Sequence, residues 1–314
     1  MNTGKTNVFI DGRSGTTGLR IAERLQIRDD IELIVLDDAE RHSEKRRAEA
    51  INASDITFLC LPDAAAVQAV GMVKNPDTVI IDASTAHRTK AGWVYGFPEL
   101  SQKQAELIAK SKRIAAPGCH ASGFTALAAP LTRAGIIPKG ALLTCFSLTG
   151  YSGGGRSMIA DYEKEERSPL LGAPRQYGLG QQHKHLAEMQ AMCLLDAPPA
   201  FCPIVADFYS GMEVTVPVFA SQLCGGASAA DIAAVYAETY NGPIVSFDAE
   251  LCSGGFLSAC MMSGKDSMRL TVCGCGERIL LAAVYDNLGK GASGAAIECM
   301  NIVMGCDITS GLSL

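Results

Sequence analysis

The feature that most constrains the fold is a glycine-rich turn near the start of the sequence. Residues 7–11 predict a short β-strand, residues 12–18 hold glycines with the spacing G-x-x-G-x-x-G, and residues 19–26 have a helical pattern. A strand that passes through a glycine turn into a helix leaves backbone N–H groups free to hold a phosphate, as in dinucleotide-binding folds. A tight turn without a ligand has the same pattern, but the strand and helix around it favour a cofactor site. The predicted phosphate-binding residues are Gly12, Ser14, Gly15, Thr16, Thr17 and Gly18.

Later apolar runs predict more strands of the same sheet. Residues 32–36, 56–62 and 78–82 are rich in Ile, Leu, Val and Phe, as expected of parallel strands covered by helices on both faces. Ligands bind beyond the carboxyl ends of such strands. Pro62 and Ser84 lie at two of these ends and are therefore further candidates for the cofactor site. The sequence predicts an α/β fold with a Rossmann-type parallel sheet at the N-terminus.

The residues after the second strand give two conflicting indications about the cofactor. The acidic pair at 37–38 is typical of a site that binds the ribose hydroxyls of NAD. Arg41 and the basic residues 45–47 follow closely and are suited to the 2′-phosphate of NADP. A solvated helix face would also be basic. The physical argument alone leaves NAD and NADP open.

Cys119 is the candidate nucleophile. It follows Pro117 and Gly118, and residues 121–134 are predicted to be helical. A cysteine at a helix N-terminus is favoured as the reactive thiolate, because N–H groups and the positive end of the helix dipole point at it. The same N–H groups can stabilise an oxyanion. A buried structural cysteine is an equally good interpretation from position alone.

Two other stretches are suited to binding an anion and a cofactor. Arg88 is a candidate clamp, because a guanidinium matches the geometry of phosphate or carboxylate; a surface arginine is the alternative. Three consecutive glycines at 153–155 predict that the backbone approaches a ligand closely there, or that the loop is flexible. Ser152 and Arg156 flank these three glycines.

A histidine pair supplies the candidate acid–base group. His183 and His185 open a stretch predicted to be helical from 181 to 195, and Glu188 lies three residues after His185. Residues three apart share a helix face. A carboxylate beside an imidazole fixes its tautomer and raises its basicity. An exposed histidine pair without a catalytic role is the alternative interpretation.

The composition limits the class of protein. With 48% hydrophobic and 19% charged residues and a net charge of −6, the sequence predicts a globular protein for which nucleic acid is not the main partner. It contains no apolar run of 18 residues, so no membrane span is expected. The short polar N-terminus lacks the apolar core of a signal peptide, and a cytoplasmic location is expected. In that compartment the twelve cysteines are expected to be thiols, and no metal site is predicted.

The pattern changes after residue 201. Alternating runs between 201 and 285 predict a mixed or antiparallel sheet, and residues 295–304 form a helix of small residues that is expected to pack back on the first domain. We therefore expect a dinucleotide-binding domain of residues 1–118 with about 286–314. Residues 119–285 are expected to form an α+β catalytic, substrate and oligomerisation domain.

Taken together, the motifs resemble one family over essentially the full length. The sequence is similar to the N-acetyl-γ-glutamyl-phosphate reductases of the shorter second type, within the semialdehyde dehydrogenase group. The motifs that carry the resemblance are FIDG (9–12), GTTG (15–18), LPD (61–63), DASTAHR (82–88), WVYGFPE (93–99), PGC (117–119), GYSGGG (150–155), HKH (183–185) and DNLGKGA (286–292). One position departs from the family pattern: His120 follows the cysteine, where the family usually has an aromatic residue.

The resemblance implies a reaction in arginine biosynthesis. NADPH would reduce N-acetyl-γ-glutamyl phosphate to N-acetylglutamate 5-semialdehyde with release of phosphate. Cys119 would form a thioester. His185 would exchange the proton, with Glu188 orienting it and His183 as the competing candidate.

The same resemblance implies roles for other residues. Arg88 would bind the phosphate. The glycines at 153–155 would lie against the nicotinamide, with Gly153 and Gly154 assigned to the cofactor, and Ser152 and Arg156 beside them would bind the substrate. Asn287 and Gly291 would complete the cofactor site. A homo-oligomer is expected, with a small-molecule acyl phosphate as substrate.

Two rival hypotheses remain from the sequence. The first keeps the enzyme class but changes the acyl phosphate to aspartyl phosphate or a carrier-bound glutamyl phosphate. The second is a non-catalytic, cofactor-binding redox sensor in which Cys119 is a sensitive thiol. The histidine pair, Arg88 and the three glycines argue against the sensor.

Overall fold

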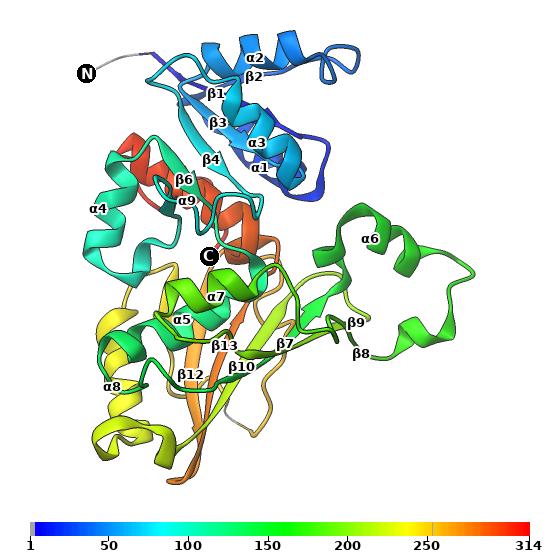
Figure 1. Ribbon diagram of the computed structural model, residues 1–314. Coiled ribbons are helices and arrows are strands. Elements are labelled where there is room, and N and C mark those ends of the chain that lie inside the picture. Colours follow the sequence, from blue (N-terminus) through cyan, green and yellow to red (C-terminus); the bar gives the residue numbers. More distant parts are fainter. Residues whose placement is uncertain (1–3, 253) are drawn as a thin grey trace. The chain divides into compact units, whose positions relative to one another are not determined.

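The computed structural model describes residues 4–252 and 254–314. The chain forms two compact units, each with its own sheet (Figure 1). The first unit comprises Met1–Pro98, Gln102–Pro117 and Ala292–Leu312. The second comprises Glu99–Ser101, Gly118–Gly291 and Ser313–Leu314. Within the described ranges, every helix is too short or too polar to cross a bilayer.

The first unit is an α/β layer structure around a six-stranded sheet in which all strand pairs are parallel. The sheet order is β2-β1-β3-β4-β6-β5. Its strands are β1 (Thr6–Asp11), β2 (Ile31–Ile34), β3 (Ile56–Leu59), β4 (Val79–Asp82), β5 (Val94–Tyr95) and β6 (Arg113–Ala115). Its helices are α1 (Thr16–Leu25), α2 (Glu44–Ala53), α3 (Asp63–Gly71), α4 (Gln102–Lys110) and α9 (Gly294–Met304).

Alternation along the strands explains why this sheet is covered on both faces. Val8 and Ile10 pack with buried residues of α1, α4 and α9, whereas Phe9 between them packs with α2 and α3. Successive side chains of a strand point to opposite faces, so an uninterrupted apolar run needs a helix layer on each side. The sheet and its two helix layers confirm the predicted α/β class with a Rossmann-type N-terminal sheet.

The second unit is built on a seven-stranded mixed sheet of order β11-β12-β13-β10-β7-β9-β8. The β7–β9 and β11–β12 pairs are parallel and the other pairs are antiparallel. Its strands are β7 (Thr144–Gly150), β8 (Arg175–Gln176), β9 (Ala200–Ala206), β10 (Met212–Phe219), β11 (Val245–Phe247), β12 (Met268–Gly274) and β13 (Arg278–Tyr285). Its helices are α5 (Cys119–Arg133), α6 (Gly155–Glu163), α7 (Leu186–Met192) and α8 (Ala229–Thr239).

Helix α5 is the buried centre of the second unit, and His120 through Thr132 are all buried. Tyr236 of α8 and Tyr240 at its C-cap donate hydrogen bonds to carbonyls of α5: Tyr236 Oη to Leu127 O at 2.6 Å and Tyr240 Oη to Ala126 O at 2.8 Å. On the sheet side, a Cβ added at Gly123 would lie 2.7 Å from Tyr285 Oη. Because overpacking of this kind typically costs about 1–3 kcal/mol, a small residue is needed there. Helix α5 is therefore closely packed on both sides.

One local prediction was wrong, and another segment differs from one of its two interpretations. The helix expected from 181 begins only at Leu186, because Gln181 adopts a positive φ of 52° that a helix cannot accommodate. The three glycines at 153–155 are part of regular structure, which differs from the flexible loop that was one of their two interpretations. They lie in a 3₁₀ turn, Tyr151–Gly154, which continues into α6 from Gly155. Gly155 has a φ of 71° at this junction, which a side-chain-bearing residue would adopt only with strain.

Candidate active site

The N-terminal glycine turn has the shape of a phosphate cradle. Gly12 has a φ of 85°, and a Cβ there would lie 2.3 Å from Cys60 O. A Cβ at Gly18 would lie 2.5 Å from Gly12 O, whereas one at Gly15 would meet its nearest atom at 3.4 Å. Helix α1 begins at Thr16 without a side-chain cap on its N-terminus. The backbone at this helix start is therefore suited to an anion.

Ser14, Thr16 and Thr17 complete this turn. Ser14 is exposed, and the two threonines are half-buried in the first turn of α1. Hydroxyl groups at such positions can donate hydrogen bonds to a phosphate alongside the backbone N–H groups. The six residues predicted for phosphate binding thus form one continuous turn.

The basic residues after β2 already have acidic partners. Arg47 forms a bidentate ion pair with the buried Asp11 of β1, with Nη2 to Oδ2 at 2.7 Å. Arg46 is ion-paired with Glu40 at 2.7 Å and with Glu49. The Glu40 and Glu49 carboxylates raise the pKa of the Arg46 guanidinium. Arg47 thus ties α2 to the sheet, while Arg46 is still half exposed.

The ends of β3 and β4 place Pro62, Ser84 and Arg88. Pro62 caps α3, and Ser84 donates from its N–H and its hydroxyl to Asp82 at 2.9 and 2.7 Å. Arg88 is buried and donates from Nε to Ala116 O at 2.9 Å and from Nη2 to Ala83 O at 3.0 Å. These contacts brace the ends of two strands, which is a structural role for the predicted anion clamp.

Cys119 is the first residue of α5, and Gly118 is its N-cap. The Gly118 N–H donates to Glu188 Oε1 at 2.8 Å, and Tyr285 Oη donates to Cys119 O at 2.5 Å. A Cβ at Gly291 would lie 3.1 Å from Cys119 Cβ. The predicted nucleophile is half-buried at a helix start, held from three sides by residues far away in the sequence.

The two predicted acid–base residues lie together in the second unit. The centroids of the His183 and His185 rings are 4.8 Å apart, and His183 Nδ1 accepts from the His185 N–H at 3.2 Å. His185 is buried, and burial together with the charge of Lys184 lowers the pKa of His183. Glu188 is buried and its Oε1 bonds to Gly118, which ties α7 to the turn before Cys119.

A third ring completes the histidine cluster. His120 lies 5.7 Å from His183 and 5.6 Å from His185, measured between ring centroids. Its two nitrogens are hydrogen-bonded to Ser147 and Tyr177. Sequence reasoning treated His120 only as a departure from a pattern, because its partners are 27 and 57 residues away.

The 3₁₀ turn after β7 brings Ser152 and Asn287 together. Asn287 donates from Nδ2 to Ser152 Oγ at 2.9 Å and accepts from the Gly211 N–H at 2.9 Å. A Cβ at Gly153 would lie 3.5 Å from Asn287 Nδ2. Three of the residues predicted for cofactor and substrate are thus in contact, whereas Arg156 is exposed on α6.

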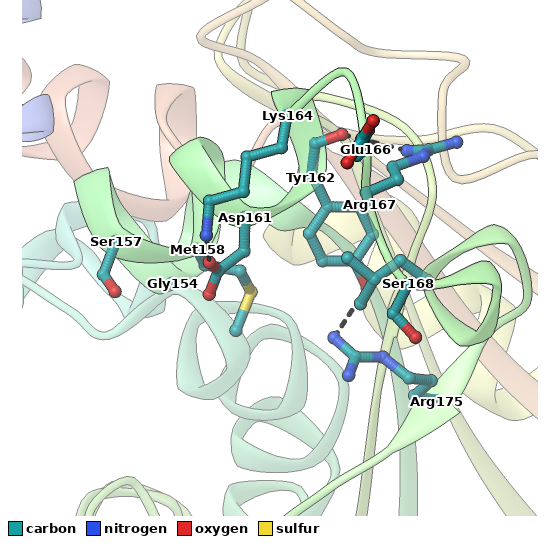
Figure 2. A pocket seen from close by; sticks show the side chains of 11 residues that line it. Gly154, Ser157, Met158, Asp161, Tyr162, Lys164, Glu166, Arg167, Ser168 and Arg175 are labelled. Atoms are coloured by element: carbon teal, nitrogen blue, oxygen red, sulfur yellow. Dashed lines mark hydrogen bonds and ion pairs between the residues drawn. The ribbon is translucent and has the colours of Figure 1, made fainter.

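A separate pocket of about 480 Å³ lies beside α6 (Figure 2). Arg175 reaches the Tyr162 hydroxyl there at 3.1 Å, and Arg167 is paired with Asp207 at 2.6 Å. Among the predicted site residues, only Gly154 lines this pocket. Arg167 in this lining is thus already paired with a carboxylate.

Comparison with known proteins identifies the family. Residues 7–108 match the semialdehyde dehydrogenase NAD-binding domain, and residues 119–287 match the semialdehyde dehydrogenase dimerisation domain. The N-acetyl-γ-glutamyl-phosphate reductase of Burkholderia ambifaria is 43% identical over 304 residues, which is 95% of this chain and 96% of that protein. The chain belongs to the N-acetyl-γ-glutamyl-phosphate reductase family. The predicted resemblance is confirmed.

Other relatives agree with this assignment. N-acetyl-γ-glutamyl-phosphate reductase 2 of Pseudomonas putida is 43% identical over 95% of this chain and 96% of its own length. Among solved structures, aspartate semialdehyde dehydrogenase II of Vibrio cholerae has a TM-score of 0.72 at 16% identity, covering 96% of this chain and 99% of that one. Aspartate semialdehyde dehydrogenase of Candida albicans, solved with NADP, has a TM-score of 0.67 at 13% identity, covering 97% and 100%. These two likenesses concern the fold.

This reductase has a further buried pair that sequence reasoning missed. His87 Nδ1 donates to Asp82 Oδ2 at 2.6 Å, and its ring stacks on Trp93 with centroids 4.0 Å apart. Both acid and imidazole lie in the DASTAHR motif, five residues apart. The two residues are close in the sequence, but they lie at a strand end and in the turn after it. Such a segment has no periodic pattern that would predict a contact between residues five apart.

Proposed function

We propose that this reductase converts N-acetyl-γ-glutamyl phosphate to N-acetylglutamate 5-semialdehyde and phosphate with NADPH, in arginine biosynthesis. The observation that carries the proposal is Cys119 at the start of a closely packed buried helix, with two histidines in the same unit. The 43% identical relatives bear the name of this activity. The rival hypothesis of a redox sensor does not account for relatives that are reductases.

We assign the nucleophilic step to Cys119. The thiolate attacks the acyl carbon, and phosphate leaves with the electron pair of the C–O bond, so that a thioester remains. The N–H groups and dipole at the start of α5 stabilise both the thiolate and the oxyanion. The hydrogen bond from Tyr285 Oη holds the main chain of Cys119, and the absence of a side chain at Gly291 leaves room beside it.

We assign proton transfer to His185, with His183 as the competing residue. When bound, NADPH supplies a hydride to the thioester carbon. The acid–base imidazole protonates the oxygen of the resulting hemithioacetal and takes the proton back as the C–S bond breaks, which releases the aldehyde and restores the thiolate. Glu188 is proposed to orient His185. Arg88, Ser152 and Arg156 are proposed to bind the substrate.

The dinucleotide is proposed to bind to residues 1–118 with about 286–314. The cradle at Gly12 and Gly18, where a Cβ would clash with backbone, fits a pyrophosphate. Pro62 and Ser84 at the strand ends would line the same site. Gly153, Gly154, Asn287 and Gly291 of the second unit are also proposed as cofactor-binding residues. Residues 119–285 would carry the chemistry. We expect a cytoplasmic homo-oligomer, in accord with the dimerisation-domain match.

A reverse assay tests the proposal. Purified protein is given N-acetylglutamate semialdehyde, phosphate and either NADP or NAD, and nicotinamide reduction is followed by absorbance. Phosphate-dependent turnover with NADP is expected. Faster turnover with aspartate semialdehyde would favour the rival acyl phosphate, and none with either substrate would contradict the enzyme assignment.

The Cys119→Ser variant tests the nucleophile. It should lose turnover by several orders of magnitude while NADP binding stays within about twofold, because a serine alkoxide forms far less readily than a thiolate at neutral pH. Cys224→Ser, at an exposed cysteine, is the matched control. Near wild-type turnover in Cys119→Ser would refute the role.

A further inference from the structure

Cys252 and Cys273, two cysteines of the second unit, are in direct contact through their sulfur atoms. Cys273 Sγ donates a hydrogen bond to Cys252 Sγ at 2.8 Å, and the two residues are 21 positions apart in the sequence. A disulfide joins its sulfur atoms at about 2.05 Å. The two sulfurs would therefore approach by only about 0.8 Å to form that bond.

The contact links two neighbouring strands at one edge of the second sheet. Cys273 lies on β12, and Cys252 lies in the turn that follows the edge strand β11. The two strands run parallel, and their pairing extends past the end of β11, because the Asp248 N–H donates to Leu270 O at 2.8 Å. The register of the strands therefore brings this turn alongside the end of β12.

Hydrogen bonds hold the main chain on both sides of the contact. Cys273 is opposite Leu280 in the antiparallel β12–β13 pair. The carbonyl of Cys252 accepts from the Gly255 N–H at 3.1 Å, which closes the turn. The two sulfurs thus meet because the backbone places them together, and a small rotation of the side chains is enough to join them.

Both residues are thiols that solvent can reach. They are half-buried, and all twelve cysteines of the chain are free. Burial, followed by the hydrogen bond to Cys252 and its charge, raises the pKa of Cys273. The thiolate is the form that exchanges with disulfides, so we expect the pair to react faster as the pH rises above neutral.

The pair alone does not make a zinc site. Structural zinc takes four ligands in a tetrahedron. Within residues 4–252 and 254–314, no group of three or more His, Cys, Asp and Glu side chains is arranged to hold a metal ion. The other chemistry open to two thiols in contact is conversion to a disulfide. In a reducing compartment such a bond is usually transient and follows the redox state.

We propose that Cys252 and Cys273 are a modification site, at which they form a reversible intramolecular disulfide by exchange with a low-molecular-weight disulfide such as glutathione disulfide. One cysteine thiolate attacks a sulfur of glutathione disulfide, whose S–S bond breaks to release one glutathione. The second cysteine attacks the mixed disulfide and releases the other glutathione. The two cysteines lose two electrons and two protons, and glutathione disulfide gains them.

Cys275 is the rival partner for Cys252. It is exposed, and hydrogen bonding to Arg278 lowers the pKa of its thiol. However, Cys275 lies past the end of β12, in a turn where its N–H donates to Arg278 O at 2.9 Å. The contact at 2.8 Å is made by Cys273, so we expect the bond to form there.

The test is peptide mass spectrometry after incubation with glutathione disulfide at about pH 8, where ordinary thiols begin to ionise. In protein carrying Cys260→Ser and Cys275→Ser, cleavage after Glu250, Lys265 and Arg269 leaves one cysteine each in peptides 251–265 and 270–277. These two peptides should be recovered as a linked pair that a thiol reductant separates. Recovery of both peptides unlinked would overturn the proposal.

Wild-type protein and two single variants complete the test. In wild-type protein, fragmentation of the linked peptides should place the bond at Cys273, and a bond at Cys275 would overturn the proposal. Cys252→Ser should abolish the link. Cys224→Ser, at an exposed cysteine of the same unit, is the matched control and should leave its yield unchanged.

Stability gives an independent readout of whether the bond fits the native fold. Closing a loop of this length should lower the equilibrium constant for unfolding of the second unit by roughly 10²-fold in the chain-entropy model. Hydrogen exchange of β13 peptides in urea, compared between oxidised and reduced protein, measures this change. Cys252→Ser should show no such difference, and equal stability of the oxidised and reduced wild type would contradict the inference.

Neither readout uses substrate or cofactor. A disulfide found in a protein without reductase turnover would contradict the proposed function and support this inference, whereas reductase turnover without the disulfide would do the opposite.

Discussion

Burial of His120 makes the second unit sensitive to acid, by an amount that can be worked out. The pKa of this imidazole is about 3 in the folded protein and 6.5 for the free side chain. Between pH 6.5 and pH 3, the His120 side chain therefore binds a proton in the unfolded chain but not in the folded chain. Stability falls as the pH is lowered from 6.5 towards 3, with a slope of up to about 1.4 kcal/mol per pH unit. At pH 5 the accumulated loss is about 2 kcal/mol.

The perturbation that exposes this effect is His120→Phe, which has no titrating ring. The free energy of unfolding of wild-type protein should fall between pH 7 and pH 5 by about 2 kcal/mol more than that of the variant. Urea unfolding at the two pH values, read by pulsed hydrogen exchange of the α5 peptide at one fixed labelling pH, measures this for the second unit alone.

The exposed histidine of the first unit, His42, supplies the control. His42→Phe should leave the pH difference of the α5 peptide unchanged. Equal losses between pH 7 and pH 5 in wild type and His120→Phe would refute the reasoning, since they would mean that the buried ring binds a proton as readily as an unfolded one.

Two further predictions concern the remaining site. His185→Asn should lower turnover by about 10²–10⁴-fold with little change in cofactor affinity, and His183→Asn should mainly raise the KM of the substrate; steady-state kinetics that show the reverse order would exchange the two roles. Gly18→Ala should abolish tight NADPH binding in a fluorescence titration, because its Cβ would lie 2.5 Å from a backbone oxygen. Gly15→Ala, whose Cβ has room, should bind within a few fold of wild type, and equal loss in both would argue against a cradle.

The first unit was largely predictable because its information is local. Apolar runs of strand length, each followed by a helical stretch, indicate a parallel sheet wherever they occur. The turn at Gly12 and Gly18 was predictable for the same reason. A side chain at either position would clash with backbone of the same short segment or next to the neighbouring strand. Periodicity and turn chemistry therefore suffice for the fold class.

The site was less predictable because its geometry depends on residues far apart in the sequence. Nothing near Glu188 indicates that its carboxylate accepts from Gly118, which is 70 residues away. Arg88 carries the guanidinium expected of an anion clamp, but it donates hydrogen bonds to carbonyls at the ends of two strands, 28 and 5 residues away in the sequence. The start of α7 was placed too early because Gln181 is a non-glycine residue at positive φ, which no propensity indicates.

The hydrogen-bonded series Ser147–His120–Tyr177 has a consequence for how relatives of this chain diverge. In a reductase with an aromatic residue in place of His120, a hydroxyl at position 147 has no ring nitrogen to bond, so selection for serine at that position is relaxed. A lineage that acquires histidine first must bury an imidazole whose Nδ1 has no partner at position 147, whereas one that acquires the serine first loses little. We therefore expect the two positions to change in a fixed order during evolution, with serine preceding histidine.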